Sequence, residues 1–133
     1  MKQLKKFALI CIALVGFTLI TQAAVNALTP KPTIVSATNI LESETNNNGG
    51  IIELVVEFMN TRYVDIEEYI DNEWKKLGTF EVEYSGKTKS VKITITGLTP
   101  GLHTFRAIAR ISEDDPDGAI GEPFTVYVNV PQN

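Results

Sequence analysis

The amino-acid sequence predicts one all-β domain, a seven-stranded antiparallel Greek-key β-sandwich, behind an N-terminal export leader. Three observations favour this fold class. After the leader, most of the chain alternates apolar and polar residues with a period of two, which is the pattern of half-buried strands. Clusters of Gly, Asn, Asp, Ser and Pro separate these stretches at short intervals. No stretch between them has the periodicity of a convincing amphipathic helix.

The first 27 residues have the three parts of a secretory signal peptide. A basic start with three lysines is followed by an uncharged apolar run, Phe7–Ile20, and then by small residues. Cleavage is expected after Ala27, because the small residues Val25 and Ala27 precede that bond, or alternatively after Ala23. An uncleaved anchor is the other interpretation, but about 14 apolar residues are fewer than the roughly 20 that span a bilayer. The protein is therefore expected to be secreted and to meet the membrane only during export.

Removal of the leader leaves residues 28–133 as an acidic domain without cysteine. The chain has 12 Lys and Arg against 16 Asp and Glu, and the leader holds three of the lysines and no acid, so the remaining net charge is −7. An acidic surface repels phosphate backbones, which argues against nucleic-acid binding. The only cysteine, Cys11, leaves with the leader, so the core must stabilise the domain without a disulfide. The length suits one domain of about 100 residues.

The first three strands are expected at Thr33–Ala37, Ile51–Met59 and Tyr63–Ile70. The first follows a proline-marked entry, and the second follows an Asn/Gly cluster suited to positive φ. In the second strand the even positions from 52 to 58 are apolar, while Glu53 and Glu57 point to the other face. The third strand has some helical propensity around Ile66, but its β-branched and aromatic residues favour a strand.

Four further strands complete the expected set, at Trp74–Tyr84, Thr88–Thr96, Leu102–Ile111 and Pro123–Val130. The compact turn Asp71–Asn72 precedes the first of these, and Gly78 is a candidate break within it. Ser85–Gly86 and a proline-containing turn at 97–101 precede the next two. The last three strands alternate apolar and polar residues regularly, and a polar loop is expected over Pro116–Gly121.

Two segments resemble fibronectin type III and bacterial immunoglobulin-like domains. Residues 95–107, ITGLTPGLHTFRA, resemble the Leu-x-Pro-Gly corner and the aromatic-rich strand that follows it in that family. Residues 69–77, YIDNEWKKL, resemble the family's hairpin, in which a tryptophan follows the turn. The resemblance extends in order over about residues 30–131, although Phe58 stands where fibronectin modules usually carry a buried tryptophan and His103 stands near their usual tyrosine. It implies a spacing, adhesion or display role and a core position for Trp74.

No set of residues predicts an active site, so the chain is not expected to be an enzyme. His103 is the only histidine, and no serine lies in the Gly-x-Ser-x-Gly turn of a hydrolase nucleophile. His103 is expected to pack at the start of a strand and to hold the Pro100–Gly101 corner through a backbone hydrogen bond. The carboxylates at positions 67, 68, 71 and 73 are expected to be exposed charges rather than the pair of a glycosidase.

No cofactor is expected, and one acidic cluster is a candidate calcium site. Hard oxygen ligands on a loop can hold calcium. The four candidate acids are Glu113, Asp114, Asp115 and Asp117. Their spacing does not match an EF-hand loop, so a solvated loop is the favoured interpretation. One histidine and no thiol in the mature part exclude an ordinary zinc site.

The function that the sequence predicts is a secreted, non-catalytic interaction or structural module. Its partner, an extracellular protein, would be met by an outward sheet face or by the loop Ser112–Glu122. The alternative is a small carbohydrate-binding module that binds cell-surface polysaccharide through Tyr63, Tyr69 and Trp74. Tyr63 and Tyr69 are out of phase with the apolar residues of their strand, so they are expected to face solvent together with Asp65.

Overall fold

A computed structural model describes residues 29–41, 49–115 and 118–130. Within these ranges the chain has strands in antiparallel sheets and no helix, as the sequence predicted. The predicted leader with both cleavage points, and Asp117 of the acidic cluster, lie outside the described residues. A helix long and apolar enough to cross a membrane is absent from the described part of the chain.

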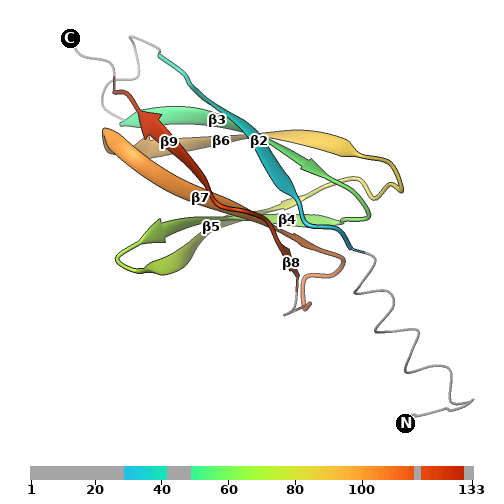
Figure 1. The fold of residues 1–133 in the computed structure, drawn as a ribbon. Helices are drawn as coiled ribbons and strands as arrows, with labels where there is room; N and C mark the ends of the chain where they lie inside the picture. The colour runs from blue at the N-terminus through green and yellow to red at the C-terminus, as the bar shows by residue number, and fades with distance from the viewer. Residues whose placement is uncertain (1–28, 42–48, 116–117, 131–133) are drawn as a thin grey trace, which may run out of the picture.

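The described residues form eight strands in two sheets (Figure 1). The strands are β2 Thr33–Asn39, β3 Gly50–Phe58, β4 Tyr63–Ile70, β5 Glu73–Glu81, β6 Lys89–Leu98, β7 Gly101–Arg110, β8 Ala119–Ile120 and β9 Phe124–Val128. The first sheet has the order β2-β3-β6, and the second has the order β5-β4-β7 with β8 and β9 both paired to β7. Seven strands correspond to those predicted. The eighth, β8, lies in the predicted loop 116–121, where two residues pair with Ile108 and Ala109.

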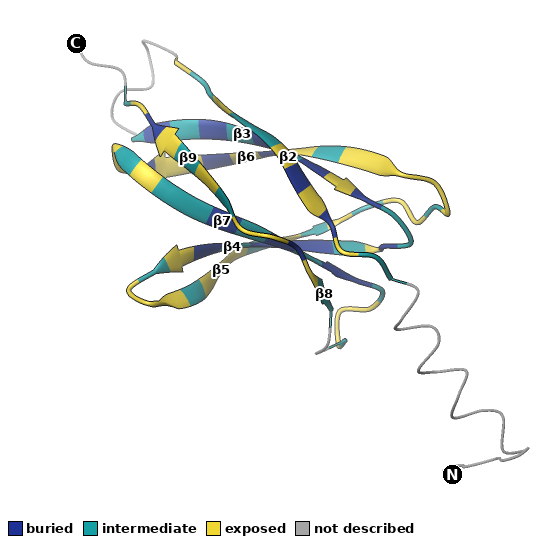
Figure 2. Ribbon diagram, in the orientation of Figure 1, coloured by how far each residue is buried: buried dark blue, intermediate teal, exposed yellow. Residues whose placement is uncertain are grey.

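Both sheets contribute to one hydrophobic core, in a sandwich-like arrangement that Figure 2 shows as dark blue positions on strands of both layers. The first sheet contributes Ile34, Ile52, Leu54, Val56, Phe58, Ile93, Ile95 and Leu98, and the second contributes Val64, Ile66, Phe105, Ala107 and Val128. These residues occupy alternate positions of their strands because successive side chains point to opposite faces of a sheet. The period-two pattern therefore predicted most of the core, including the strand assignment of the Ile66 region.

The β4–β5 hairpin confirms one predicted turn and contains an irregularity beside Gly78, the residue at which the sequence suggested a break. Asp71 and Asn72 have φ angles of 54° and 66°, the left-handed conformation that a tight two-residue hairpin turn requires. Further along, Ile66 pairs with Gly78 while Glu67 pairs with Lys76, so one residue of β5, Leu77, has no partner on β4. The extra residue forms a β-bulge. The residues of β5 before Leu77 therefore point to the opposite sheet face from the one that unbroken alternation would give them.

The bulge corrects the predicted position of Trp74. On β5, Phe80 packs against the core, and unbroken alternation would place Trp74 on the same face. Because the extra residue intervenes, Trp74 is directly opposite Tyr69 on the other face of the sheet and does not belong to the core. The strand also ends at Glu81, before the predicted Tyr84, and a 2.8 Å hydrogen bond from Val82 N to the Arg62 carbonyl oxygen continues the pairing by one position.

Candidate functional site

The candidate site is the face of the second sheet that points away from the core, called the outer face below. The core contains even positions of β4 and odd positions of β7, so the odd positions of β4 and the even positions of β7 lie on the outer face. The register places Asp65 opposite Ile108 and Glu67 opposite Arg106. Acidic residues of the central strand β4 thus lie between basic residues of β5 and β7.

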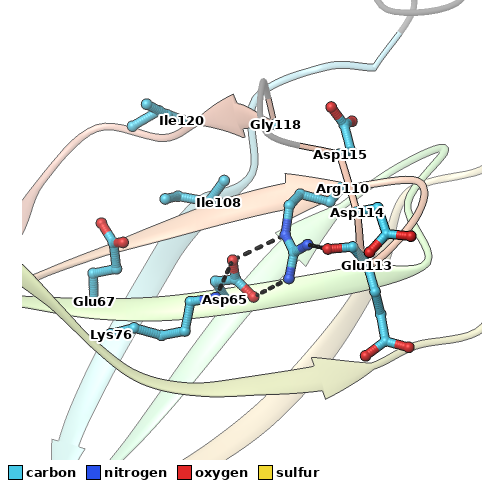
Figure 3. Close-up of a pocket in the computed structure, with 10 residues that line it drawn as sticks. All are labelled: Asp65, Glu67, Lys76, Ile108, Arg110, Glu113, Asp114, Asp115, Gly118 and Ile120. Atoms are coloured by element: carbon cyan, nitrogen blue, oxygen red, sulfur yellow. Dashed lines mark hydrogen bonds and ion pairs between the residues drawn. The ribbon is translucent and has the colours of Figure 1, made fainter.

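Asp65 is the centre of this arrangement, and it is buried although the sequence predicted that it would face solvent. The residue is 4% exposed. Arg110 donates from Nε to Oδ2 at 2.9 Å and from Nη2 to Oδ1 at 2.8 Å (Figure 3). The Thr79 hydroxyl donates to Oδ1 at 2.8 Å, and Lys76 Nζ lies 3.6 Å from Oδ2. Because these contacts come from three strands, the Asp65 carboxylate links β4, β5 and β7.

The surroundings of Asp65 also change its proton affinity. Burial is the largest single influence, and on its own it raises the pKa of this carboxyl group. The hydrogen bonds from Arg110 and Thr79, with the positive charges of Arg110 and Lys76, together outweigh burial and lower the pKa of Asp65 below its ordinary value of 3.8. The hydrogen bond to Asp65 correspondingly raises the pKa of Arg110. The pair is therefore ionised at neutral pH.

Arg110 also fixes the start of the acidic loop against the sheet. Its Nη1 donates to the Glu113 carbonyl oxygen, and it lies 3.3 Å from the Ser112 carbonyl oxygen. A shallow groove of about 310 Å³ lies between this loop and the outer face (Figure 3). Its lining consists of Asp65, Glu67, Lys76, Ile108, Arg110, Glu113, Asp114, Asp115, Gly118 and Ile120. Five carboxylates against two cations make the groove acidic.

The groove does not assemble a metal site within the described residues. No three His, Cys, Asp or Glu side chains converge there as a metal ion requires. Glu113 and Asp114 are exposed, and Asp65 is already saturated by Arg110 and Thr79. The calcium alternative therefore gains no support from the described part of the acidic cluster.

The other end of the outer face carries aromatic residues. The rings of Tyr69 and Trp74 are 5.1 Å apart between centroids and tilted by 55°. The guanidinium carbon of Arg106 lies 4.2 Å from the centroid of the Trp74 ring, and Arg106 Nε donates to Glu67 Oε1 at 2.7 Å. Arg106 therefore reaches across β4 and covers part of Trp74, while Tyr69 remains 46% exposed.

The structure separates Tyr63 from the other two predicted site residues. Tyr63 lies opposite Arg110 and Glu81, at the far end of the same strand face. Six residues of strand separate it from Tyr69, which is roughly 20 Å at the usual rise per residue. Tyr69 and Trp74 are brought together, but the three aromatic residues do not form one stripe.

Two residues of the aromatic end were missed by sequence reasoning. Leu102 and Tyr127 lie directly opposite each other on β7 and β9, and they are 72% and 57% exposed. The neighbouring pair, Thr104 and Thr125, is joined by a 2.9 Å hydroxyl hydrogen bond. Exposed positions are visible along β9 in Figure 2. The sequence contained a signal for the exposure of Tyr127, because this residue alternates with the inward Val128. Its position beside Leu102 depends on the pairing of β9 with β7, which the sequence does not show.

His103 has the structural role that the sequence predicted. Its Nε2 lies 2.8 Å from the Thr99 carbonyl oxygen, which holds the corner between β6 and β7. Its Nδ1 contacts Oε2 of Glu68, a residue that the sequence predicted to be exposed and that is only 6% exposed. The ring stacks on Phe105 with centroids 6.2 Å apart. Both ring nitrogens therefore have partners within the protein.

The outer face thus offers an acidic groove at one end and an aromatic surface at the other. No protein-family model, curated protein or solved structure matches the chain. In the groove Asp65 and Arg110 are bound to each other, while large side chains at the aromatic end are exposed to solvent. The aromatic end is therefore the part of the outer face with the most surface left for a partner.

Proposed function

We propose that the chain is a secreted, non-catalytic interaction module that binds an extracellular protein through the aromatic end of its outer face. The proposal includes the predicted leader and a Greek-key sandwich of the fibronectin type III or immunoglobulin kind. The strand order β2-β3-β6 against β5-β4-β7-β9, with the two-residue β8 set aside, supports this kinship. Fold alone does not specify function, so the partner-binding role rests on the surface.

The observation that carries the proposal is the exposure of three large side chains at one end of one sheet face. Tyr69, Leu102 and Tyr127 are 46%, 72% and 57% exposed. Tyr and other aromatic residues dominate the binding energy of protein interfaces when a partner desolvates them. The Arg106–Glu67 contact and the Thr104–Thr125 hydrogen bond, which lie beside these side chains, support such a surface.

The test compares the capture of extracellular proteins by the wild type and by two variants, each of which replaces two exposed apolar side chains with serine. Leu102→Ser/Tyr127→Ser removes apolar surface from the aromatic end. Val35→Ser/Leu41→Ser removes two other exposed apolar side chains, which lie on or beside β2. We expect a protein that the wild type and the β2 control retain and that the face variant loses. Identical capture by all three proteins would refute the role of this face.

The carbohydrate alternative keeps one supporting observation, the direct pairing of Tyr69 with Trp74. Adjacent aromatic rings can stack on sugar rings, but Arg106 already covers part of Trp74. Trp74 is the only tryptophan, so its fluorescence reports on this site alone. A saturable change in its emission on addition of polysaccharide, absent in Tyr69→Ala, would favour this alternative over protein binding.

A further inference from the structure

Among the described strands, β6 is the long, regular strand with a free edge. It closes the β2-β3-β6 sheet, and no described strand pairs with its other side. From Phe58↔Lys89 to Ile52↔Ile95 its pairing with β3 has no register shift. The strand has ten residues. An unpaired edge of this kind presents a row of backbone N–H and C=O groups that can pair with another strand.

The other edge strands of the two sheets have structural features that hinder the addition of a further strand. β2 has a register shift between Ile34 and Ser36, and its Asn39 side chain bonds to the backbone of Tyr127 at 2.9 Å and of Asn129 at 2.8 Å. β5 has the bulge at Leu77. β8 and β9 have only two and five residues. β6 has a register shift of its own between Ile95 and Leu98, but its stretch Lys89–Ile95 is longer than any unshifted stretch of β2 or β5.

The β6 edge is basic, although the domain as a whole is acidic. Lys87, Lys89 and Lys92 are exposed, and no acidic residue occurs between positions 85 and 98. The ion pairs formed among the described residues involve none of these three lysines. Their charge therefore favours an acidic partner at the free side of the strand.

A groove beside the beginning of β6 adds a place for an apolar side chain. It has a volume of about 190 Å³ and is lined by Phe58, Glu81, Val82, Glu83, Lys89, Ser90 and Val91. The apolar side chains Phe58, Val82 and Val91 all pack against or belong to the core cluster. Since Glu81 and Glu83 line the same groove, acidic side chains of a ligand belong on the outer side of the sheet, near Lys92.

We propose that the β6 edge binds an extended, acidic segment of another protein as an added antiparallel strand. Backbone hydrogen bonds supply the affinity, and alternate side chains of the segment face the groove and Lys92. A second copy of this chain is the disfavoured occupant, because its own β6 carries Lys89 and Lys92 and no acidic residue to complement this edge. The site lies on the first sheet, so it does not rest on the function proposed for the aromatic end.

The test measures hydrogen–deuterium exchange of the purified protein with a soluble peptide of alternating Glu and Val. We expect slower exchange of the amides in residues 89–98, and no slowing with the matched Lys–Val peptide. The variant Lys89→Glu/Lys92→Glu is expected to bind about tenfold more weakly, which is about 1.4 kcal/mol. The control Lys31→Glu/Lys75→Glu changes the net charge equally at other sites and is expected to keep the slowing.

Three outcomes would overturn the proposal. The first is unchanged exchange of β6 at saturating peptide, and the second is equal slowing in the Lys89→Glu/Lys92→Glu variant. The third is a concentration-dependent dimer in sedimentation, with β6 protected in the absence of peptide, which would assign the edge to a second copy. The face variant Leu102→Ser/Tyr127→Ser is expected to keep the peptide-induced slowing, so failure at one surface is distinguishable from failure at the other.

Discussion

Removal of the Arg110 charge tests whether the buried ion pair stabilises the outer face. In Arg110→Met, Asp65 keeps only the Thr79 hydroxyl at 2.8 Å and Lys76 at 3.6 Å. The side chains of Asp65 and Arg110 are 5% and 9% exposed, so water cannot replace the lost partner without opening the structure. Loss of one partner of such a buried pair costs about 3–5 kcal/mol, and we expect about 3 kcal/mol here because Lys76 and Thr79 remain.

The measurement is urea unfolding followed by circular dichroism, with the slope checked for an unchanged extent of unfolding. The double variant Asp65→Leu/Arg110→Met removes both charges together, and replacement of a whole buried pair by apolar residues is often neutral or stabilising by about 1–4 kcal/mol. We therefore expect the double variant to be more stable than Arg110→Met. A loss below about 1 kcal/mol in the single variant, typical of exposed pairs, would refute the reasoning.

Three further outcomes follow from the same structure. The lowered pKa of Asp65 gives stability that is present above its ordinary value of 3.8 and is lost as pH falls through the folded-state value, so acid should destabilise the wild type more than Asp65→Asn in urea titrations. Deletion of Leu77 leaves all other β4–β5 pairs in register, so Trp74 emission should stay unchanged and stability should fall by less than about 1 kcal/mol, within the range of surface changes. His103→Ala leaves a buried carboxylate and a corner carbonyl without a donor and should cost about 1–3 kcal/mol in thermal or urea unfolding.

Sequence reasoning predicted the parts of the fold that depend on local pattern. The strands β3 and β7 follow from alternation alone, and the positive φ of Asp71 and Asn72 follows from the turn chemistry of those residues. The hydrogen bond from His103 to the corner was also predicted, because the two groups are four residues apart. In each case the interacting residues are neighbours in the sequence, so no knowledge of strand pairing was needed.

Two of the errors concern positions whose surroundings depend on how strands pair. Asp65 looked like an exposed residue because Arg110, which buries it, is 45 residues away and arrives only through the β4–β7 register. The core position of Trp74 was implied by the family resemblance alone. The bulge that places Trp74 on the outer face is defined only by the pairing of β5 with β4.

The same pairing determines where the molecule has surface left to bind. Charged side chains in the middle of the outer face form ion pairs between β4, β5 and β7, and these ion pairs hold the strands in one register. Backbone N–H and C=O groups are likewise hydrogen-bonded wherever a strand has a neighbour on each side. Uncommitted groups are therefore concentrated at the end of the outer face, where Leu102 and Tyr127 are exposed, and along the free side of β6. The two surfaces differ in chemistry, one apolar and one basic with free backbone, so the two proposals require partners of different kinds.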